Sequence, residues 1–166
     1  MEIQTLLSQH QSYRGFIYSI IGNLLKKCNH EVVIVAPEVP HSGASHKITL
    51  EGPLIQKDVK LDGQFFGISI NGTPADSVKL ALAEIYKEVD IVASGINLGN
   101  NAGPAIYYSG TVGAAFEAFA VGKTALAFSF NSFKEEAFEG LEERLLPFMP
   151  KLIEMCNEKM LYNINI

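Results

Sequence analysis

Short apolar runs alternate with amphipathic stretches along almost the whole chain of 166 residues. Apolar runs of four to seven residues are typical of parallel strands covered on both faces, and we predict six: about Ile3–Leu7, Glu31–Ala36, Phe66–Ile70, Ile91–Ser94, Ala125–Phe130 and Leu161–Ile166. Apolar residues at spacings of three and four predict four helices: Gly15–Lys27, Pro74–Lys87, Thr111–Val121 and Phe133–Lys159, the last broken or kinked near Pro147 and Pro150. Such alternation predicts an α/β fold with a mostly parallel sheet.

Two stretches depart from this alternation. The segment His46–Phe65 alternates every second residue and contains the turn signals Gly52-Pro53 and Asp62-Gly63, so we expect an antiparallel excursion at a sheet edge. The final "LYNINI" has the pattern of a strand with nothing after it to cover it. We therefore expect either a truncated chain or a partner at that strand.

Composition limits the classes of protein that fit. The chain has 48% hydrophobic residues, enough for one compact domain spanning residues 1–166. A net charge of −5 without a run of Lys or Arg argues against binding a nucleic-acid duplex, and no apolar run approaches the roughly 20 residues that span a bilayer. Cys28 and Cys156 lack metal-ligand spacing, and the first residues do not have the pattern of a signal peptide, so we expect a cytoplasmic protein.

The loops that follow the predicted strands are the places to look for chemistry, because ligands of open parallel sheets bind at the carboxyl ends of the strands. The first is Ser8-Gln9-His10-Gln11, the second runs from Pro37 to His46, and the third is "NGTPADS". Within the third, Thr73-Pro74-Ala75-Asp76 is explained as an ordinary helix start, with Thr73 and Asp76 forming a capping box. The fourth loop, from Ser94 onward, has four glycines and three asparagines ahead of Thr111.

This fourth loop has the composition of a phosphate-binding site without a lysine. Ser109-Gly110-Thr111 opens a helix whose free N–H groups and dipole attract an anion, and Asn97, Asn100 and Asn101 precede it. Neither G-x-x-x-x-G-K-[ST] nor G-x-G-x-x-G is present, which argues against a nucleotide-cofactor domain. Ser42-Gly43-Ala44-Ser45 lacks the G-x-S-x-G pattern of a serine nucleophile, and we expect His41 and His46 to be solvated loop residues.

Three long motifs occur in order along the chain: "VAPEVPHSGASHKITLEGPL", "INGTPADSVKLAL" and "DIVASGINLGNNAGPAIYYSGTVGAAFEAFAVG". Together they resemble the SurE family of metal-dependent nucleotidases. The resemblance implies a Rossmann-like three-layer sandwich that hydrolyses nucleoside 5′- or 3′-monophosphates, or other phosphomonoesters, with a divalent cation such as Mg or Mn. It places Ser42 and Asn97 at the metal. Asn101, Ser109, Gly110 and Thr111 match the phosphate-facing residues, with Asn97, Ser109 and Thr111 as the catalytic candidates.

The chain departs from the family pattern where the family carries Asn-Asp-Asp-Gly after its first strand. An ungapped alignment puts Leu7, Ser8, Gln9 and His10 on those four positions, so that both carboxylates are missing. Ser8 and Gln9 offer neutral oxygens as weaker metal ligands, and His10 suits Mn, Zn or Co. Ala105 stands where the family usually has an aspartate, which removes further negative charge.

The family extension that follows the "LYNINI" strand and builds the family dimer is also absent, although a homodimer or higher homo-oligomer remains the expectation. Two functions stay open. One is a phosphomonoesterase with weak activity. The other is an inactive homologue that binds a nucleotide or phosphate, or serves in an assembly.

Overall fold

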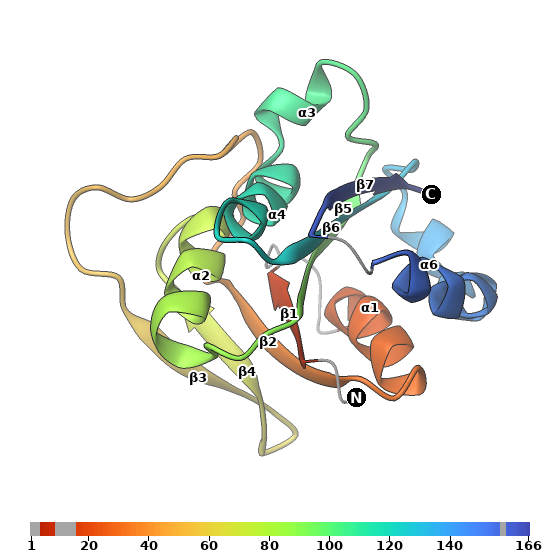
Figure 1. The fold of residues 1–166 in the computed structure, drawn as a ribbon, viewed down its shortest axis with the longest axis horizontal. Helices are drawn as coiled ribbons and strands as arrows, with labels where there is room; N and C mark the ends of the chain where they lie inside the picture. Colours follow the sequence, from red (N-terminus) through yellow and green to blue (C-terminus); the bar gives the residue numbers. More distant parts are fainter. Residues whose placement is uncertain (1–3, 9–15, 157–158) are drawn as a thin grey trace.

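A seven-stranded sheet forms the centre of the molecule, with the strand order β3-β4-β2-β1-β5-β6-β7 (Figure 1). The computed structural model describes residues 4–8, 16–156 and 159–166. The strands are β1 (Gln4–Ser8), β2 (Glu31–Pro37), β3 (Gln56–Leu61), β4 (Gln64–Ile70), β5 (Ile91–Leu98), β6 (Thr124–Phe130) and β7 (Leu161–Asn165). All neighbouring pairs are parallel except β3 with β4. The predicted α/β class with a mostly parallel sheet is confirmed.

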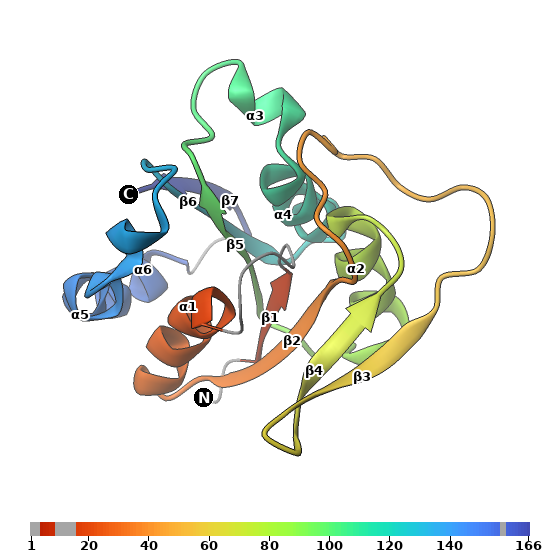
Figure 2. The same ribbon diagram turned by 180° about the vertical axis from the view of Figure 1, so that it is seen from behind.

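Helices cover both faces of the sheet, as Figures 1 and 2 show from opposite sides. Two helices, α2 (Pro74–Leu80) and α4 (Gly110–Ala120), lie on one face. The other face is covered by α1 (Phe16–Lys27), α5 (Leu141–Leu145) and α6 (Met149–Met155). Successive residues of a strand point to opposite faces, and in β6 Ala125 and Ala127 pack toward α2 and α4, whereas Leu126 and Phe128 pack toward α1. The continuous apolar strands therefore bury both faces.

The antiparallel excursion predicted over His46–Phe65 is confirmed only in its second half, as the β3–β4 hairpin at one edge of the sheet. Its turn is Asp62-Gly63, where φ is 50° and 79°, the left-handed backbone expected of an Asp-Gly hairpin turn. Residues 38–55 form a long irregular loop that connects β2 to this hairpin (Figure 2). The predicted terminal strand is β7, and it lies at the opposite edge of the sheet.

The helix predicted over Phe133–Lys159, broken or kinked near Pro147 and Pro150, is wrong in its extent. Its place is taken by short pieces: η2 (Glu135–Phe138), α5, η3 (Leu146–Phe148) and α6. Gly140 precedes α5 in a left-handed conformation with φ 66°, and the prolines at 147 and 150 lack the N–H that a continuous helix requires, so the predicted break there is confirmed. The helix predicted at Pro74–Lys87 ends instead in a π-helical segment, η1 (Ala81–Ile85).

Within the described ranges, no helix has the length and apolar character needed to cross a membrane.

Candidate functional site

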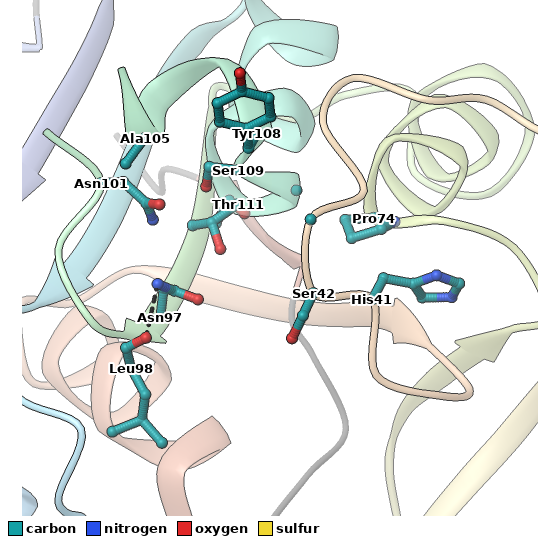
Figure 3. A pocket seen from close by; sticks show the side chains of 13 residues that line it. His41, Ser42, Pro74, Asn97, Leu98, Asn101, Ala105, Tyr108, Ser109 and Thr111 are labelled. Atoms are coloured by element: carbon teal, nitrogen blue, oxygen red, sulfur yellow. Dashed lines mark hydrogen bonds between the residues drawn. The ribbon is translucent and has the colours of Figure 1, made fainter. Parts of the chain in front are cut away.

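A cavity of about 290 Å³ lies at the carboxyl edge of the sheet, where β2, β4 and β5 end (Figure 3). Three separate segments line it: the loop after β2, the first residue of α2, and the stretch from the end of β5 to the start of α4. The lining residues are His41, Ser42, Gly43, Pro74, Ser94, Asn97, Leu98, Asn101, Ala105, Tyr108, Ser109, Gly110 and Thr111.

Most of the residues predicted from the sequence meet in this cavity. Ser42, Asn97, Asn101, Ser109, Gly110 and Thr111 all line it. Ser8 ends β1 in register with the cavity residue Ser94 of β5, so its backbone lies at the same edge of the sheet. Gln9 and His10 lie outside the described residues. Sequence reasoning missed Ser94 and Tyr108 as lining residues.

The end of β5 is irregular, and this irregularity brings two of its polar residues to one side. Ser94 and Asn97 are three positions apart, a spacing that directs side chains to opposite faces of a regular strand. The register between β5 and β6 shifts between these two residues, and both line the cavity. Gly95 within the shift has φ 120°, and a Cβ there would lie 2.3 Å from the Phe128 carbonyl oxygen. Only glycine fits this close approach of β5 to β6.

The amide of Asn97 has a defined orientation. Its Nδ2 donates to the carbonyls of Leu98 at 2.9 Å and Gly99 at 2.8 Å. The other end of the amide, Oδ1, points toward the side of the cavity where Ser42 lies (Figure 3). Asn97 therefore presents an acceptor oxygen, and its donor serves the backbone of its own loop.

Helix α4 begins at the cavity with Ser109 as its N-cap residue, whose Oγ accepts a hydrogen bond from Val112 N at 3.1 Å. Because the first N–H groups of a helix have no partner within it, one side-chain cap leaves others available to a ligand. No acidic residue stands in the first turn of α4. Gly110 packs closely against the loop after β2, since a Cβ there would lie 3.4 Å from the His41 carbonyl oxygen.

The loop that carries Ser42 is held against α4. Ser45 N donates to the Tyr108 carbonyl at 3.0 Å, and a Cβ on Gly113 would lie 2.3 Å from Ser45 O, so the helix accommodates the loop only through a glycine. His46 Nε2 lies 2.8 Å from Glu117 Oε2, which changes the expectation of a merely solvated histidine. Lys79 donates to the other oxygen of Glu117 at 2.9 Å.

The Glu117 carboxylate is nearly buried on α4. Burial alone would raise the pKa of Glu117, but the hydrogen bonds with Lys79 and His46 and the positive charge of Lys79 hold that pKa below its ordinary value. Glu117 is therefore ionised at neutral pH and links α4 to α2 and to the Ser42 loop.

The cavity offers neutral oxygens to a cation. Ser42 and Asn97 supply a hydroxyl and an amide oxygen, and among the described residues that line the cavity there is no Asp or Glu. In the part of the chain that the structure describes, no group of three or more His, Cys, Asp or Glu side chains is placed to hold a metal ion. Mg and Mn bind oxygen ligands, and carboxylates dominate their affinity, so these oxygens fit a hard cation in type but not in charge.

Fold and cavity together define a three-layer α/β protein with a polar, oxygen-rich cavity at the carboxyl edge of a mostly parallel sheet. The sequence profile of the family described as "Survival protein SurE" matches residues 15–166. The 5′-nucleotidase SurE of Petrotoga mobilis is 42% identical over 140 residues, which cover 82% of this chain and 56% of that protein. The 5′-nucleotidase SurE of Caldanaerobacter subterraneus is also 42% identical, over 92% of this chain and 60% of that protein.

A solved structure agrees with these sequence matches. The crystal structure of the SurE protein from Aquifex aeolicus superposes with a TM-score of 0.83 and 32% sequence identity, over 98% of this chain and 65% of that one. The chain belongs to the SurE family. It spans a little over half the length of the curated relatives that it matches.

Proposed function

We propose that the chain is a phosphomonoesterase that hydrolyses nucleoside 5′- or 3′-monophosphates. The observation that carries the proposal is the convergence of three segments on one cavity: the start of α4, the amide oxygen of Asn97 and the hydroxyl of Ser42. The relatives named 5′-nucleotidase SurE support the same class of reaction.

The start of α4 is the anion-binding part of the proposed site. The N–H groups of the first turn and the positive end of the helix dipole attract a phosphate. Gly110 lets the phosphate approach the backbone closely, and the hydroxyl of Thr111 and the amide of Asn101 provide polar contacts beside it. Ser109 holds the first turn in place through its cap.

The proposal includes a divalent cation, Mg or Mn. Ser42 and Asn97 are its proposed ligands, and Ser8 and Gln9 are proposed as neutral contributors. A bound cation of this kind polarises a phosphoryl group and lowers the pKa of a bound water. Since Mg commonly takes part of its oxygen shell from the phosphate of a substrate, we expect this cation to bind weakly by itself.

A second function is supported by the charge of the cavity. None of the lining residues that the structure describes carries a carboxylate, and Ala105 occupies the cavity wall where the family pattern has an aspartate. A protein that keeps the anion-binding helix start without charged metal ligands binds a nucleotide or phosphate and hydrolyses little of it. We propose this binding module as the alternative.

One experiment separates the two functions. Hydrolysis of p-nitrophenyl phosphate and of nucleoside monophosphates is measured with Mg, Mn and Co, and phosphate and Mn binding by calorimetry. The double variant Ser8→Asp plus Gln9→Asp is compared with Ser8→Asn plus Gln9→Asn, a matched pair of similar size without the charge. For the esterase we expect slow turnover in the unmodified chain and faster turnover in the Asp pair alone.

The other outcomes are equally definite. Phosphate binding without turnover in all three proteins favours the binding module. Absence of phosphate binding in all three contradicts both functions.

We also propose self-association, because β7 is an edge strand of the described sheet and pairs there with β6 alone. Light scattering at increasing concentration tests this. A constant monomer mass contradicts it.

A further inference from the structure

The strand β7 presents two asparagines to the side of the sheet that faces the cavity loop. Asn163 and Asn165 are two positions apart and therefore point to the same face, in register with Ala127 and Ser129 of β6. The alternate residues Tyr162 and Ile164 pack into the apolar core on the other face. On the face of the asparagines only the first residue of β7, Leu161, packs against the core.

Both asparagines bond to the backbone of one cavity residue, Asn101. Asn165 Oδ1 accepts from Asn101 N at 2.8 Å, and Asn163 Nδ2 donates to Asn101 O at 2.7 Å. The two partners lie 64 and 62 residues away in the sequence. Asn101 lies in a loop, outside the described strands. The two asparagine side chains therefore provide the hydrogen-bond partners that a neighbouring strand would give to its backbone N–H and C=O.

The side chain of Asn101 is held as well. Its Nδ2 donates to Ser129 Oγ at 2.7 Å, and Ser129 is fully buried on β6. Ser129 is in register with Asn97 of β5, so this bond ties Asn101 to the strand pair that carries the other amide of the cavity. Asn101 is 6% exposed and still lines the cavity.

We propose that Asn163 and Asn165 are positioning residues, which hold Asn101 in the orientation that the phosphate site requires. The inference rests on the proposed phosphate-binding function and extends the site to a strand that does not line the cavity. Both backbone groups and the side chain of Asn101 are hydrogen-bonded before a ligand binds. The conformational entropy of this residue is therefore lost on folding, and binding a phosphate requires no further loss.

The two asparagines use opposite ends of their amides, and this allows a discriminating test. An aspartate keeps the acceptor that Asn165 provides, whereas it replaces the donor of Asn163 with an oxygen that faces the Asn101 carbonyl. Asn165→Asp and Asn163→Asp add the same charge two residues apart on one strand face. A difference between them therefore reports the hydrogen bonds.

The readouts are the Kd of inorganic phosphate by calorimetry and the hydrogen exchange of the Asn101 amide by NMR, both on the full chain. Loss of the Asn163 bond in Asn163→Asp or Asn163→Ala is expected to weaken phosphate binding about tenfold. Asn165→Asp is expected to bind within about twofold of the unmodified chain and to keep the Asn101 amide protected, whereas Asn165→Ala exposes it to exchange. Asn163→Ala, which adds no charge, serves if Asn163→Asp does not fold.

Tyr162→Phe is the matched control on the same strand. It removes the hydrogen bond from the Tyr162 hydroxyl to the Met155 carbonyl on the opposite face, and we expect an unchanged phosphate Kd. Equal weakening by the two aspartate variants, or an unchanged Kd in Asn163→Ala, overturns the positioning role and leaves the proposed function standing. An unmodified chain that binds no phosphate overturns the proposed function, and with it this role.

Discussion

Two helices begin at the cavity, α2 at Pro74 and α4 at Gly110, and both of these residues line it. The start of α2 is closed by its own carboxylate: Asp76 accepts from the Thr73 and Thr49 amides and from the Thr49 hydroxyl. Among the described side chains the Ser109 hydroxyl alone caps the start of α4, and no acidic residue stands in its first turn.

This difference separates a structural helix start from one suited to a ligand. A helix N-terminus favours a negative charge, and at α2 the Asp76 carboxylate provides it. The same carboxylate holds the loop after β2 through its hydrogen bonds with Thr49. At α4 no acidic residue of the first turn supplies that charge, so an external anion such as phosphate can supply it. A helix N-terminus is therefore a candidate anion-binding site where no carboxylate of the protein already accepts hydrogen bonds from its first turn.

The largest effect is expected from removing the carboxylate at α2. Asp76→Ala removes a buried carboxylate that accepts from the buried Thr73 amide and from the amide and hydroxyl of Thr49, and we expect the free energy of unfolding to fall by about 3 kcal/mol. Chemical denaturation measures it. Asp76→Asn keeps an acceptor oxygen and is expected to lose less. Equal stability of Asp76→Ala and the unmodified chain would refute the structural role assigned to this helix start.

The same carboxylate gives α2 a pH dependence. Burial alone would raise the pKa of Asp76, but hydrogen bonds from Thr49 and Thr73 lower it below its ordinary value. A lowered folded-state pKa contributes stability above the unfolded pKa of about 3.9, and this contribution is lost as the pH falls through the folded pKa. The difference in unfolding free energy between the unmodified chain and Asp76→Asn should shrink as the pH is lowered below 4. Glu117, whose pKa is also lowered, is present in both proteins and cancels. A difference that stays constant with pH contradicts this origin.

A second effect is expected from filling the open helix start. Thr111→Asp places a carboxylate in the first turn of α4, where it takes the position of the external anion. We expect phosphate affinity to fall about thirtyfold, equivalent to about 2 kcal/mol, while the helix itself is not destabilised. Thr111→Asn is the neutral match and should bind phosphate more tightly than Thr111→Asp. Calorimetry measures both, and equal affinities would show that the start of α4 is not the anion site.

The two helix starts also show what the sequence can and cannot predict. The capping box at Thr73 and Asp76 is confirmed because it depends on residues three apart, and the helix start at Ser109 was found from equally local signals. The sheet class follows from hydrophobic periodicity, which is a property of each segment alone. Local signals thus account for most of the sheet and for the two helix starts.

Hydrogen bonds between residues far apart in the sequence could not be predicted. The bonds of Asn101 to Asn163 and Asn165 join segments more than 60 residues apart, and no local pattern specifies such a pairing. The shift in β5 that brings Ser94 into the cavity depends on how β5 packs against β6. The error over Phe133–Lys159 has a different cause. Helical spacing continues across Gly140, but the left-handed backbone of this residue does not allow a continuous helix to run through it.

The smallest effect is expected at the cap of α4 itself. Ser109→Ala removes the acceptor for Val112 N, and loss of a single N-cap hydroxyl costs about 1 kcal/mol of unfolding free energy. This is less than the loss expected at Asp76, because one neutral hydrogen bond is removed here and several to a buried carboxylate are removed there. Ser109→Thr keeps the hydroxyl and should restore most of the stability. Thermal and chemical unfolding of the three proteins test this order. A loss in Ser109→Ala as large as that in Asp76→Ala would mean that the start of α4 is fastened as firmly as that of α2, and the contrast between a closed and an open helix start would fail.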